Sequence, residues 1–574
     1  RRRRSRRAIH EEEVDAAGGA VPKMYFSHTT DTHEYNAVLN TLRLGGLHRS
    51  GVRTGRWSLC WAGQLTADSL RCLSPNQVIN HFPGSWHMGR KDNLARHVRR
   101  LQRLHPERVR IAPATFVLPE DAQTFAAARK ASPGALWIYK PANSSCGRGI
   151  RLLRSRPDLA AERALDKRGG VVQRYVERPL LVDGFKFDLR LYVVVTSFDP
   201  LKVYLNSEGL VRLATERYSA SPSNLGKRTM HLTNYSVNKR AEAYVKNLDG
   251  CGVAFDGAGG GQCADNFECD KDGHWADQDA ADSDEDTASE QDDGEGSGPE
   301  NEALGFSPAS TAVSSPPPLG GGPASSKWSL RQLQEYFVAK GLDYAVTMSR
   351  IKDLIIKTLI AVEPPIVGAG QKGPVVQVSS KTQALRGLRP IQSCFEIYGF
   401  DVLVDDDLQP WLLEVNTAPS LSSSSPFDKR VKTQVVADAL TLVGLRPCDP
   451  RSEGRAARQE RQSQREGLTP PPKAAAKSHN LQSIGACSIR DLGEAEWATI
   501  VDTHDERLRC GALEPIFPTP QTPNRYSDLF LSQRYANLVL AKWLEEGGEE
   551  CFISGAANDL VPPWVPQLLD PEAC

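Results

Sequence analysis

The sequence predicts an α/β (α+β) fold in which mixed or antiparallel sheets are flanked by helices. Phe400–Pro419 contains two apolar runs around the acidic turn Asp405–Asp407, a pattern typical of a β-hairpin. Leu189–Thr196 is almost continuously apolar, as expected of a buried central strand. Apolar residues recur at helical spacing in Lys91–Leu104 and Ile351–Val362, so helices are expected to cover the sheets.

Short apolar runs between Gly-bearing loops predict the remaining strands. These are Trp137–Pro141, Val171–Val176, Lys186–Thr196, Leu201–Leu205 and Leu210–Ala214. Asn206–Gly209 is expected to be a turn between the last two. Pro364–Pro365 is expected to end the helix over Ile351–Val362. A last helix is predicted from about Asp428, as its N-cap, to Gly444.

Composition divides the 574 residues into five parts. They are an Arg-rich and then acidic flank that we expect to be disordered (1–20), an N-terminal domain (21–110), a central domain (111–195), a C-terminal domain (196–445) and an extension (446–574). Residues 249–326 are rich in Asp, Glu, Gly, Ser and Pro, so a disordered acidic insertion is expected there. The extension is expected to be basic and partly helical, because residues 446–477 hold eight Lys or Arg against four Asp or Glu.

Bulk properties exclude several classes of protein. Lys plus Arg and Asp plus Glu each number 70, so the formal net charge is zero. The 12 cysteines show no C-x-x-C spacing, which argues against a zinc or disulfide framework and favours a reducing compartment. No apolar run reaches the roughly 18–20 residues that span a bilayer, so no membrane association is expected. The chain begins at Arg1 rather than Met and is expected to be a fragment.

The hairpin carries a candidate metal site. Glu414 and Asn416 alternate along one strand and therefore point to the same face. Asp401 on the partner strand can lie opposite them. Two carboxylates and an amide oxygen are ligands that Mg²⁺ prefers, often together with nucleotide phosphates. The alternative is a polar sheet face beside an acidic turn.

Phosphate binding has two candidates upstream of the hairpin. Lys140, on an apolar strand, supplies a point charge suited to phosphates. The loop Gly147–Gly149 can bring backbone N–H groups close to them. Gln173–Val176 could offer hydrogen bonds to a purine.

Two further segments are rich in polar groups. Lys186, Asp188 and Arg190 place three charges on a core strand, which indicates either function or a structural ion pair. His231–Ser236 is dense in hydrogen-bonding groups, and a capping turn is its alternative interpretation.

Taken together, these segments resemble the tubulin tyrosine ligase-like family of ATP-grasp ligases, and within it the polyglutamylases. The motifs that carry the resemblance are NHFPGS at Asn80–Ser85, RKDNL at Arg90–Leu94, WIYKP at Trp137–Pro141, GRGI at Gly147–Ile150, FKFDLRLYV at Phe185–Val193, HLTNYSVN at His231–Asn238, DLIIKT at Asp353–Thr358 and LLEVNTAPSL at Leu412–Leu421. They cover most of residues 75–445 in the family's order. The resemblance implies an ATP-grasp fold, with residues 111–195 and 196–445 as its central and C-terminal domains.

The resemblance also implies roles for individual residues. ATP would be held by Lys140, Gly147, Arg148, Gly149, Ile150, Gln173, Arg174, Tyr175, Val176, Lys186, Phe187, Asp188, Thr233 and Asn234. Mg²⁺ would be held by Asp401, Glu414 and Asn416, in agreement with the hairpin pattern. Free L-glutamate would contact Arg212, Tyr235, Ser236, Lys327 and Lys432, and the catalytic residues would be Arg190, Arg212 and Lys432.

Two features depart from the family's pattern. Cys146-Gly147 stands where relatives usually have Arg-Gly, so one phosphate contact is expected to be lost or replaced by Arg148. The acidic insertion between Ser236 and Lys327 is the second departure.

The implied activity is tubulin polyglutamylation through an acyl phosphate, by a monomer in the cytoplasm and cytoskeleton, including cilia or flagella. Arg509–Pro518 and the basic segment before it resemble the microtubule-docking extension of polyglutamylases, and positive charge steers acidic tubulin tails. Nucleic acid is not expected as a partner, because no stacking or groove-reading module accompanies the charge. The alternatives are a glutamylase of other acidic proteins, a glycine ligase, which Arg212 disfavours, and an inactive microtubule-binding protein.

Overall fold

The computed structural model describes residues 23–63, 70, 73–74, 76–153, 169–247, 325–371, 393–448, 481–553, 561 and 565, apart from gaps at 31, 145, 482 and 549. The predicted basic and acidic flank (1–20), nearly all of the acidic insertion, and residues 449–477 of the basic segment lie outside the described residues.

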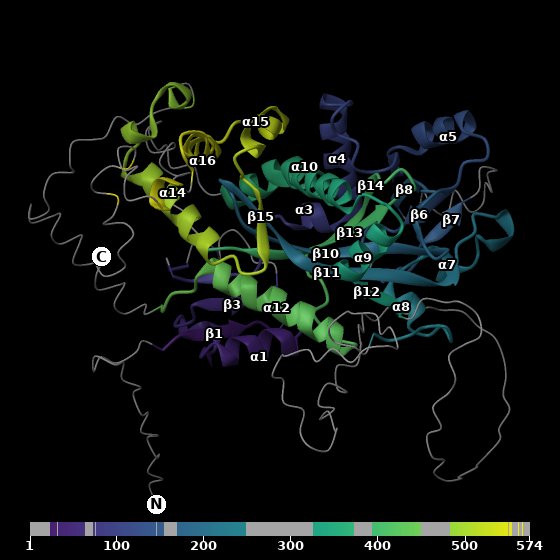
Figure 1. Ribbon diagram of the computed structural model, residues 1–574, viewed down its shortest axis with the longest axis horizontal. Helices are drawn as coiled ribbons and strands as arrows, with labels where there is room; N and C mark the ends of the chain where they lie inside the picture. Colours follow the sequence, from purple (N-terminus) through teal and green to yellow (C-terminus); the bar gives the residue numbers. More distant parts are fainter. Residues whose placement is uncertain are drawn as a thin grey trace, which may run out of the picture. The chain divides into compact units, whose positions relative to one another are not determined.

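A seven-stranded antiparallel sheet carries the central elements (Figure 1). Five strands follow one another as β12-β11-β10-β13-β14, while β9 pairs with β10 and β15 pairs with β11. Their bounds are β9 Leu181–Val182, β10 Phe185–Phe198, β11 Leu201–Arg217, β12 Lys327–Ser329, β13 Glu396–Val404, β14 Pro410–Asn416 and β15 Leu513–Phe517. The predicted hairpin around Asp405–Asp407 is therefore confirmed as the β13–β14 pair.

Two long helices cover the two faces of this sheet (Figure 1). On one face, Leu354 and Leu359 of α10 (Tyr344–Gln371) join Phe187, Leu189 and other residues in one hydrophobic core. On the other face, α12 (Pro426–Val443) packs against Tyr192 and Val194. Both faces of β10 are therefore buried, as its apolar sequence predicts.

A four-stranded antiparallel sheet forms the second part of the candidate site. Its order is β5 (Thr115–Leu118), β8 (Gly170–Arg174), β6 (Trp137–Lys140) and β7 (Arg151–Leu153). Phe125 of α5 (Ala122–Ala131) packs against Trp137 and covers one face. The opposite face carries the side chains of Lys140 and Gln173, which are hydrogen-bonded to each other.

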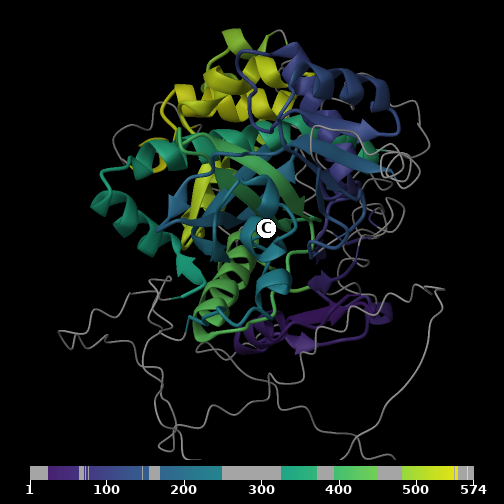
Figure 2. The same cartoon turned by 90° about the vertical axis from the view of Figure 1, so that its right-hand side faces the viewer.

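The N-terminal strands form a small parallel sheet that lies near α12 (Figure 2). Its order is β2 (His48–Arg49), β1 (Tyr25–His28), β3 (Leu59–Trp61) and β4 (Val78–Ile79). The remaining helices are α1 Asn36–Leu44, α3 Trp86–Gly89, α4 Lys91–Leu104, α7 Arg228–His231, α8 Tyr235–Asn238, α9 Leu330–Ala339, α14 Glu494–Leu508, α15 Thr522–Tyr526, α16 Tyr535–Glu545 and α17 Glu550–Ile553, with short 3₁₀ turns η1 Val52–Thr54, η2 Pro222–Asn224, η4 Ile484–Ala486, η5 Ile489–Asp491 and η6 Ser527–Leu529.

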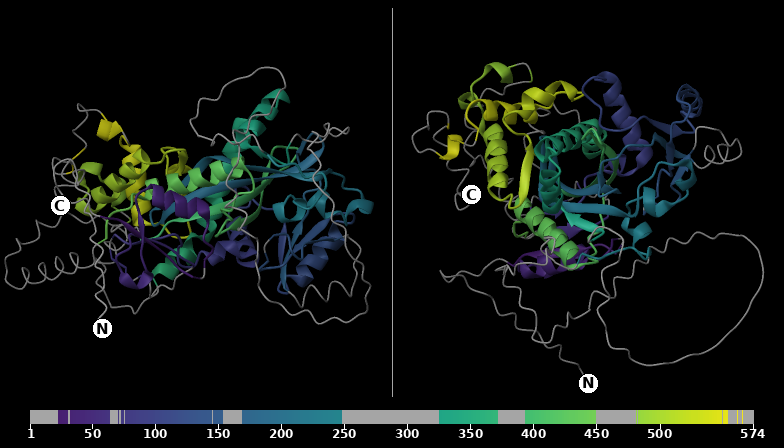
Figure 3. Two further views of the ribbon diagram at one scale, coloured as in Figure 1. Left: turned by 90° about the horizontal axis from the view of Figure 1, so that it is seen from below. Right: turned by 45° about the vertical axis from the view of Figure 1, so that its right-hand side comes forward.

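The C-terminal extension is joined directly to the central sheet (Figure 3). Its strand β15 pairs with residues 203–206 of β11. Glu506 of α14 is buried and accepts hydrogen bonds from Lys202 of β11 and Thr196 of β10. Because a buried carboxylate needs such partners, this part of the extension is built into the fold.

Two boundaries differ from the predicted ones. The expected boundary at residue 195 falls inside β10 (Phe185–Phe198), which still pairs with β11 beyond that residue, at Ser197 and Phe198. Ser325 and Ser326, predicted to belong to the insertion, are buried in the fold. Ser326 N donates to the Val245 carbonyl at 2.9 Å, so the two ends of the insertion meet.

The predicted turn at Asn206–Gly209 is wrong, because β11 is a single 17-residue strand. Leu191 pairs with Gly209 and Val193 pairs with Leu205, so β11 has two extra residues there and forms a bulge. Ser207 N donates to the Ala512 carbonyl of the extension at 3.0 Å, which ties the bulge to the extension.

Two predicted helix ends are also wrong. α10 continues through Pro364 and Pro365 to Gln371. The N-cap of α12 is Ser425, whose hydroxyl accepts from Asp428 N at 3.2 Å. Its predicted end is confirmed, since Gly444 has the left-handed φ of 66° that favours glycine. No helix among the described residues combines the length and the apolarity that crossing a membrane requires.

Candidate active site

A row of charged side chains crosses one face of the seven-stranded sheet. The strand register pairs Lys327 with Arg212 and Arg212 with Asp188. Further along, Arg190 pairs with Asp401, and Asp401 pairs with Glu414. The pairing of β10 with β13 thus brings together Arg190 and Asp401, which are 211 positions apart in the sequence.

Asp401 lies at the centre of this row and binds two arginines. Arg190 donates to it from Nε at 2.5 Å and from Nη2 at 3.0 Å, and Arg212 Nη2 lies 2.9 Å from its Oδ2. Burial opposes ionisation of Asp401, but the two guanidinium groups outweigh it and hold the pKa of this carboxyl below its usual range. Asp401 is therefore an anion at neutral pH.

A bulge in β14 brings Glu414 opposite Asp401. Asp401 pairs with Glu414 but Val402 pairs with Leu412, so Leu413 is the extra residue. Glu414 forms an ion pair with Lys91 at 3.0 Å. Asn416 donates its Nδ2 to the Gly399 carbonyl at 3.4 Å, which leaves its amide oxygen as the atom that can face a cation.

The donor set of Asp401, Glu414 and Asn416 fits a hard divalent cation such as Mg²⁺. Two of its members are cross-strand neighbours that line the same cavity, and all three offer oxygen. By contrast, the side chain of Asp405 in the acidic turn accepts from two backbone N–H groups and from Trp411 Nε1. Asp406 and Asp407 lie next to Arg178, so the turn needs no ion to be stable.

Two lysines of the site are buried beside mostly uncharged partners. Lys140 Nζ donates to Gln173 Oε1 at 2.9 Å and to the Leu413 carbonyl at 3.2 Å. Lys186 Nζ donates to the Tyr175 hydroxyl and to the His231 carbonyl, both at 2.9 Å. Burial lowers the pKa of Lys140 to about 8 and that of Lys186 to about 7, despite the neighbouring carboxylates of Glu414 and Asp188. Both lysines would gain from an anion placed nearby.

A cavity of about 70 Å³ collects most of the residues predicted to hold ATP and metal. The predicted residues that line it are Lys140, Gly147, Ile150, Gln173, Arg174, Tyr175, Val176, Lys186, Asp188, Thr233, Asn234, Asp401 and Glu414. The predicted residues that do not line it are Arg148, Gly149, Phe187, Arg190, Arg212, Tyr235, Ser236, Lys327, Asn416 and Lys432. The side chain of Phe187 lies in the hydrophobic core on the opposite face, so only its backbone could reach a ligand.

The glycine-bearing loop is held against α7 and α8. Arg228 Nη2 donates to the Gly147 carbonyl at 2.7 Å, and Ser236 Oγ donates to the Cys146 carbonyl at 2.9 Å. A Cβ on Gly147, whose φ is 71°, would lie 3.2 Å from the side chains of Asn234 and Val237, so the loop approaches these residues closely.

Three of the residues predicted to bind the amino acid form a second cluster beside the edge strand β12, namely Tyr235, Lys327 and Lys432. Lys327 Nζ lies 2.6 Å from Asp428 Oδ2, 2.8 Å from Ser424 Oγ and 4.3 Å from the centre of the Tyr235 ring. Lys432, one turn after Asp428 on α12, donates to the Ser422 carbonyl. Lys327 and Lys432 therefore place two ammonium groups around one carboxylate.

Lys91 is the main residue of the site that sequence analysis missed. Besides Glu414, it binds the Ser144 carbonyl at 2.8 Å, so it links α4, the glycine-bearing loop and the metal ligands. Its position in the RKDNL motif is the sequence signal that could have identified it. Its partner Glu414 could not be inferred in this way, because it lies 323 residues further along the chain.

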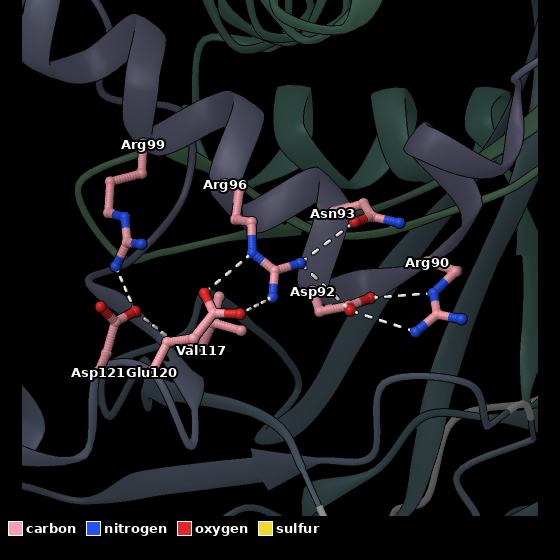
Figure 4. A network of polar contacts seen from close by, with 8 residues as sticks. All are labelled: Arg90, Asp92, Asn93, Arg96, Arg99, Val117, Glu120 and Asp121. Carbon is pink, nitrogen blue, oxygen red and sulfur yellow. Dashed lines mark hydrogen bonds and ion pairs between the residues drawn. The ribbon is translucent and has the colours of Figure 1, made fainter. Parts of the chain in front are cut away.

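A polar network fixes the helix that carries Lys91 (Figure 4). From α4, Arg96 binds Glu120 at 2.6 Å, and Arg99 binds Asp121. Arg90 and Arg96 also share Asp92, at 3.2 and 3.3 Å. Since Asp121 accepts from Val117 N at 2.7 Å, the network joins the start of α4 to the four-stranded sheet.

The sheets, the buried lysines and the carboxylate set define an ATP-grasp-like protein. The chain belongs to the Tubulin-tyrosine ligase family, which it matches over residues 70–251 and 322–452. The predicted fold class and family are thus confirmed.

Several curated relatives are similar along most of this chain. The human tubulin monoglutamylase TTLL4 is 32% identical over 551 residues, which are 89% of this chain and 38% of the relative. The mouse tubulin polyglutamylase TTLL5 is 32% identical over 88% of this chain and 33% of its own length. The tubulin polyglutamylase ttll-4 of Caenorhabditis elegans is 30% identical over 84% of this chain and 66% of its own length. The chain thus spans only a third to two thirds of these relatives.

Proposed function

We propose that this chain is an ATP-dependent ligase that adds glutamate, through isopeptide bonds, to glutamate side chains of tubulin C-terminal tails. The observation that carries the proposal is the row of charges from Lys327 to Glu414 beside the buried lysines Lys140 and Lys186. The names of the relatives, which are tubulin monoglutamylases and polyglutamylases, support it.

ATP is treated as a substrate in this proposal. An oxygen of the acceptor side-chain carboxylate attacks the γ-phosphorus, and ADP leaves, which gives an acyl phosphate. The deprotonated amino group of free glutamate then attacks the acyl carbon. A C–N bond forms, the C–O bond to phosphate breaks, and inorganic phosphate leaves with the proton that the amine nitrogen gives up. Such chemistry depends on positioning and on neutralising charge more than on a protein nucleophile.

The chain's own residues have distinct tasks. Lys140 and Lys186 neutralise phosphate oxygens in a site from which water is largely excluded. Arg190 and Arg212, held in place by Asp188 and Asp401, face the transferred group. Asp401, Glu414 and Asn416 would hold Mg²⁺, which when bound withdraws charge from the phosphates.

Charge also supports an acidic donor and an acidic acceptor. Lys327 and Lys432 carry two positive charges beside the single negative charge of Asp428, so the cluster has one net positive charge. Free glutamate, which is a net anion, balances this charge, whereas glycine, which has no net charge, does not. A larger cavity of about 930 Å³ adjoins the first, and Arg99, Arg103, Arg110, Arg174 and Arg178 are among the residues that line it. Arginines suit carboxylates through bidentate contacts.

The proposed partner is tubulin in microtubules, and the proposed location is the cytoplasm and cytoskeleton, including cilia or flagella. The protein would act as a monomer. Glycine ligation, modification of other acidic proteins and an inactive microtubule-binding role are the competing functions.

Mass spectrometry of tubulin tails tests these functions against one another. The protein is incubated with microtubules, ATP, Mg²⁺ and either glutamate, glycine or tyrosine. Added masses are expected only with glutamate, on glutamate side chains, and only with ATP. Added glycine, or modification of another acidic protein but not of tubulin, would replace the proposed function. A control with Arg212→Met should show no addition, because the transferred group loses its cation.

A further inference from the structure

The donor amino acid poses a problem that the predicted contacts do not solve. Arg212, Lys327 and Lys432 are all cations, whereas a free amino acid also carries an ammonium group. That group becomes the nucleophile, so it has to be oriented before it reacts. An ammonium group needs acceptors, and a buried one needs an anion among them.

Most carboxylates on this face of the sheet are already committed. Asp188 binds Arg212 through both oxygens, and Asp401 binds Arg190 through both oxygens. Glu414 faces Lys91 and the metal position. Asp428 differs from these, because its Oδ2 binds Lys327 and Ser424 while its buried Oδ1 has no hydrogen-bond partner among the described residues.

A second unpartnered oxygen lies on the strand beside it. The hydroxyl of Tyr192 is fully buried and also has no hydrogen-bond partner within the described parts of the chain. Tyr192 packs with Phe427 and Val431, which flank Asp428 on α12. Burial raises the pKa of Tyr192, with Asp428 adding to the effect and Arg190 opposing it, so the hydroxyl lies within the electrostatic reach of both.

We propose that Asp428 and Tyr192 form a subsite for the α-ammonium group of the donor amino acid. The subsite rests on the proposed ligase function and deepens it. Oδ1 of Asp428 and the Tyr192 hydroxyl oxygen accept hydrogen bonds from the ammonium group. Lys327 and Lys432 remain for the donor's carboxylates. Native proteins rarely leave a buried carboxylate oxygen or a buried hydroxyl unsatisfied, unless a ligand or water completes it.

Tyr192→Phe is the deciding variant, because the lost hydroxyl bonds nothing in the described protein. The melting temperature should stay the same or rise, since an unsatisfied buried group is removed. The KM for glutamate should rise about tenfold or more, the effect of losing one hydrogen bond to a charged group. The KM for ATP should change by less than about twofold.

Glutarate, which is glutamate without its amino group, separates the ammonium subsite from the carboxylate contacts. As a competitive inhibitor it should bind parent and Tyr192→Phe equally. Asp428→Asn should also weaken the binding of glutamate more than that of glutarate. This variant additionally removes the ion pair with Lys327. The matched controls are Tyr398→Phe, a buried tyrosine on β13 whose hydroxyl binds Glu396 in the opposite core, and Asp438→Asn on α12. Neither should alter glutamate affinity.

The outcomes are distinct. An unchanged KM for glutamate in Tyr192→Phe would overturn the subsite and leave the ligase function standing, as would equal losses for glutamate and glutarate. If the parent ligated no amino acid, the proposed function would fail instead. Calorimetry of glutamate and glutarate binding would then test the subsite without turnover. The subsite requires that the parent bind glutamate more tightly than glutarate and that Tyr192→Phe lose this difference.

Discussion

Lys140 and Lys186 make the ligand-free site sensitive to pH. Burial lowers their pKa values to about 8 and about 7, from an ordinary 10.5. Between pH 7 and 10.5 the unfolded chain therefore binds more protons at Lys186 than the folded chain does. By linkage, this group makes the free energy of unfolding rise with pH across that window. Phosphates that bind beside the lysines should reverse the shift, because they favour the charged form.

Nucleotide binding should therefore take up protons at pH 8. We expect about one proton per nucleotide, since Lys186 is mostly neutral in the free protein and charged beside phosphates. Titration calorimetry in two buffers of different ionisation enthalpy measures this uptake. Lys186→Met should abolish most of this proton uptake. Lys352→Met, which removes the exposed ion pair between Lys352 and Glu514, should not. Equal uptake in parent and Lys186→Met would assign the protons elsewhere.

Glu414→Gln tests the metal position. The change keeps the size of the side chain but removes one negative ligand. Ligation should fall by about a hundredfold or more at saturating ATP, because transition-state charge is no longer balanced. Circular dichroism should show an intact fold. Asp406→Asn in the exposed acidic turn is the control, and normal turnover in Glu414→Gln would remove the residue from the site.

At the scale of the element, α10 shows how a helix tolerates two prolines. Pro365 has no N–H to donate to the carbonyl of Ala361, four residues earlier. Arg100 of α4 supplies the missing donor, with its Nη2 3.2 Å from that oxygen. The carbonyl is thereby satisfied, and the helix continues to Gln371.

A double-mutant cycle tests this compensation. Arg100→Met should lower the free energy of unfolding by about 1–3 kcal/mol, the usual effect of leaving a buried acceptor unpaired. In a Pro365→Ala background the loss should largely disappear, because the new N–H reaches Ala361. Urea denaturation measures both, with Arg103→Met as an exposed control on the same helix. Equal losses in the two backgrounds would show that Arg100 stabilises the protein in another way.

The acidic insertion is predicted to be dispensable. Its ends are joined by hydrogen bonds between Val245 and Ser326, at 2.9 and 3.0 Å, so a short linker can replace residues 249–324. A Gly/Ser linker should leave activity on a peptide unchanged. The melting temperature should fall by less than about 5 °C, which corresponds to roughly 1–2 kcal/mol. A larger fall would mean that the insertion packs against the fold, and higher activity on microtubules would mean that it competes with their tails.

The sequence predicts elements well where local pattern and burial agree. The helix over Lys91–Leu104 has the predicted bounds, and its apolar stripe is buried except for Leu104. Prediction fails where distant residues decide the outcome. Arg100 of α4 donates to the Ala361 carbonyl in place of Pro365, so α10 continues beyond its prolines. The bulge in β11 is held by the hydrogen bond from Ser207 N to the Ala512 carbonyl of the extension.

The same reasoning applies to the site. The alternation along the hairpin predicts that Glu414 and Asn416 share a face and that Asp401 can lie opposite them. The bulge at Leu413, the ion pair of Lys91 and the unpartnered oxygen of Asp428 could not be predicted, because each depends on packing between segments far apart in the chain. The roles of the individual site residues remain predictions that the mutations above address.

At the scale of the whole molecule, the basic segment is predicted to separate docking from chemistry. Arg451, Arg455, Arg458, Arg461 and Arg465 lie outside the described residues, and all five are changed to Gln. Microtubule binding should weaken and lose its salt dependence, since attraction between exposed charges is screened over about 8 Å at physiological salt. Activity on a short Glu-rich peptide should change little.

Co-sedimentation and peptide assays at several salt concentrations measure these effects. If activities on peptide and microtubules fell equally, the segment would belong to the active site or to the fold. If neither changed, the charges would simply be a solvated linker.

The pairing of β15 with β11 has a consequence for synthesis of the protein. Residues 203–206 of β11 leave the ribosome about 300 residues before residues 513–517, which complete that edge. At roughly 5–20 residues per second, the strand waits about 15–60 seconds for its partner. During that time Lys202 also lacks Glu506, its buried counter-ion. The nascent seven-stranded sheet thus exposes a strand edge to other chains, and a chaperone that covers β11 would protect it until translation passes residue 517.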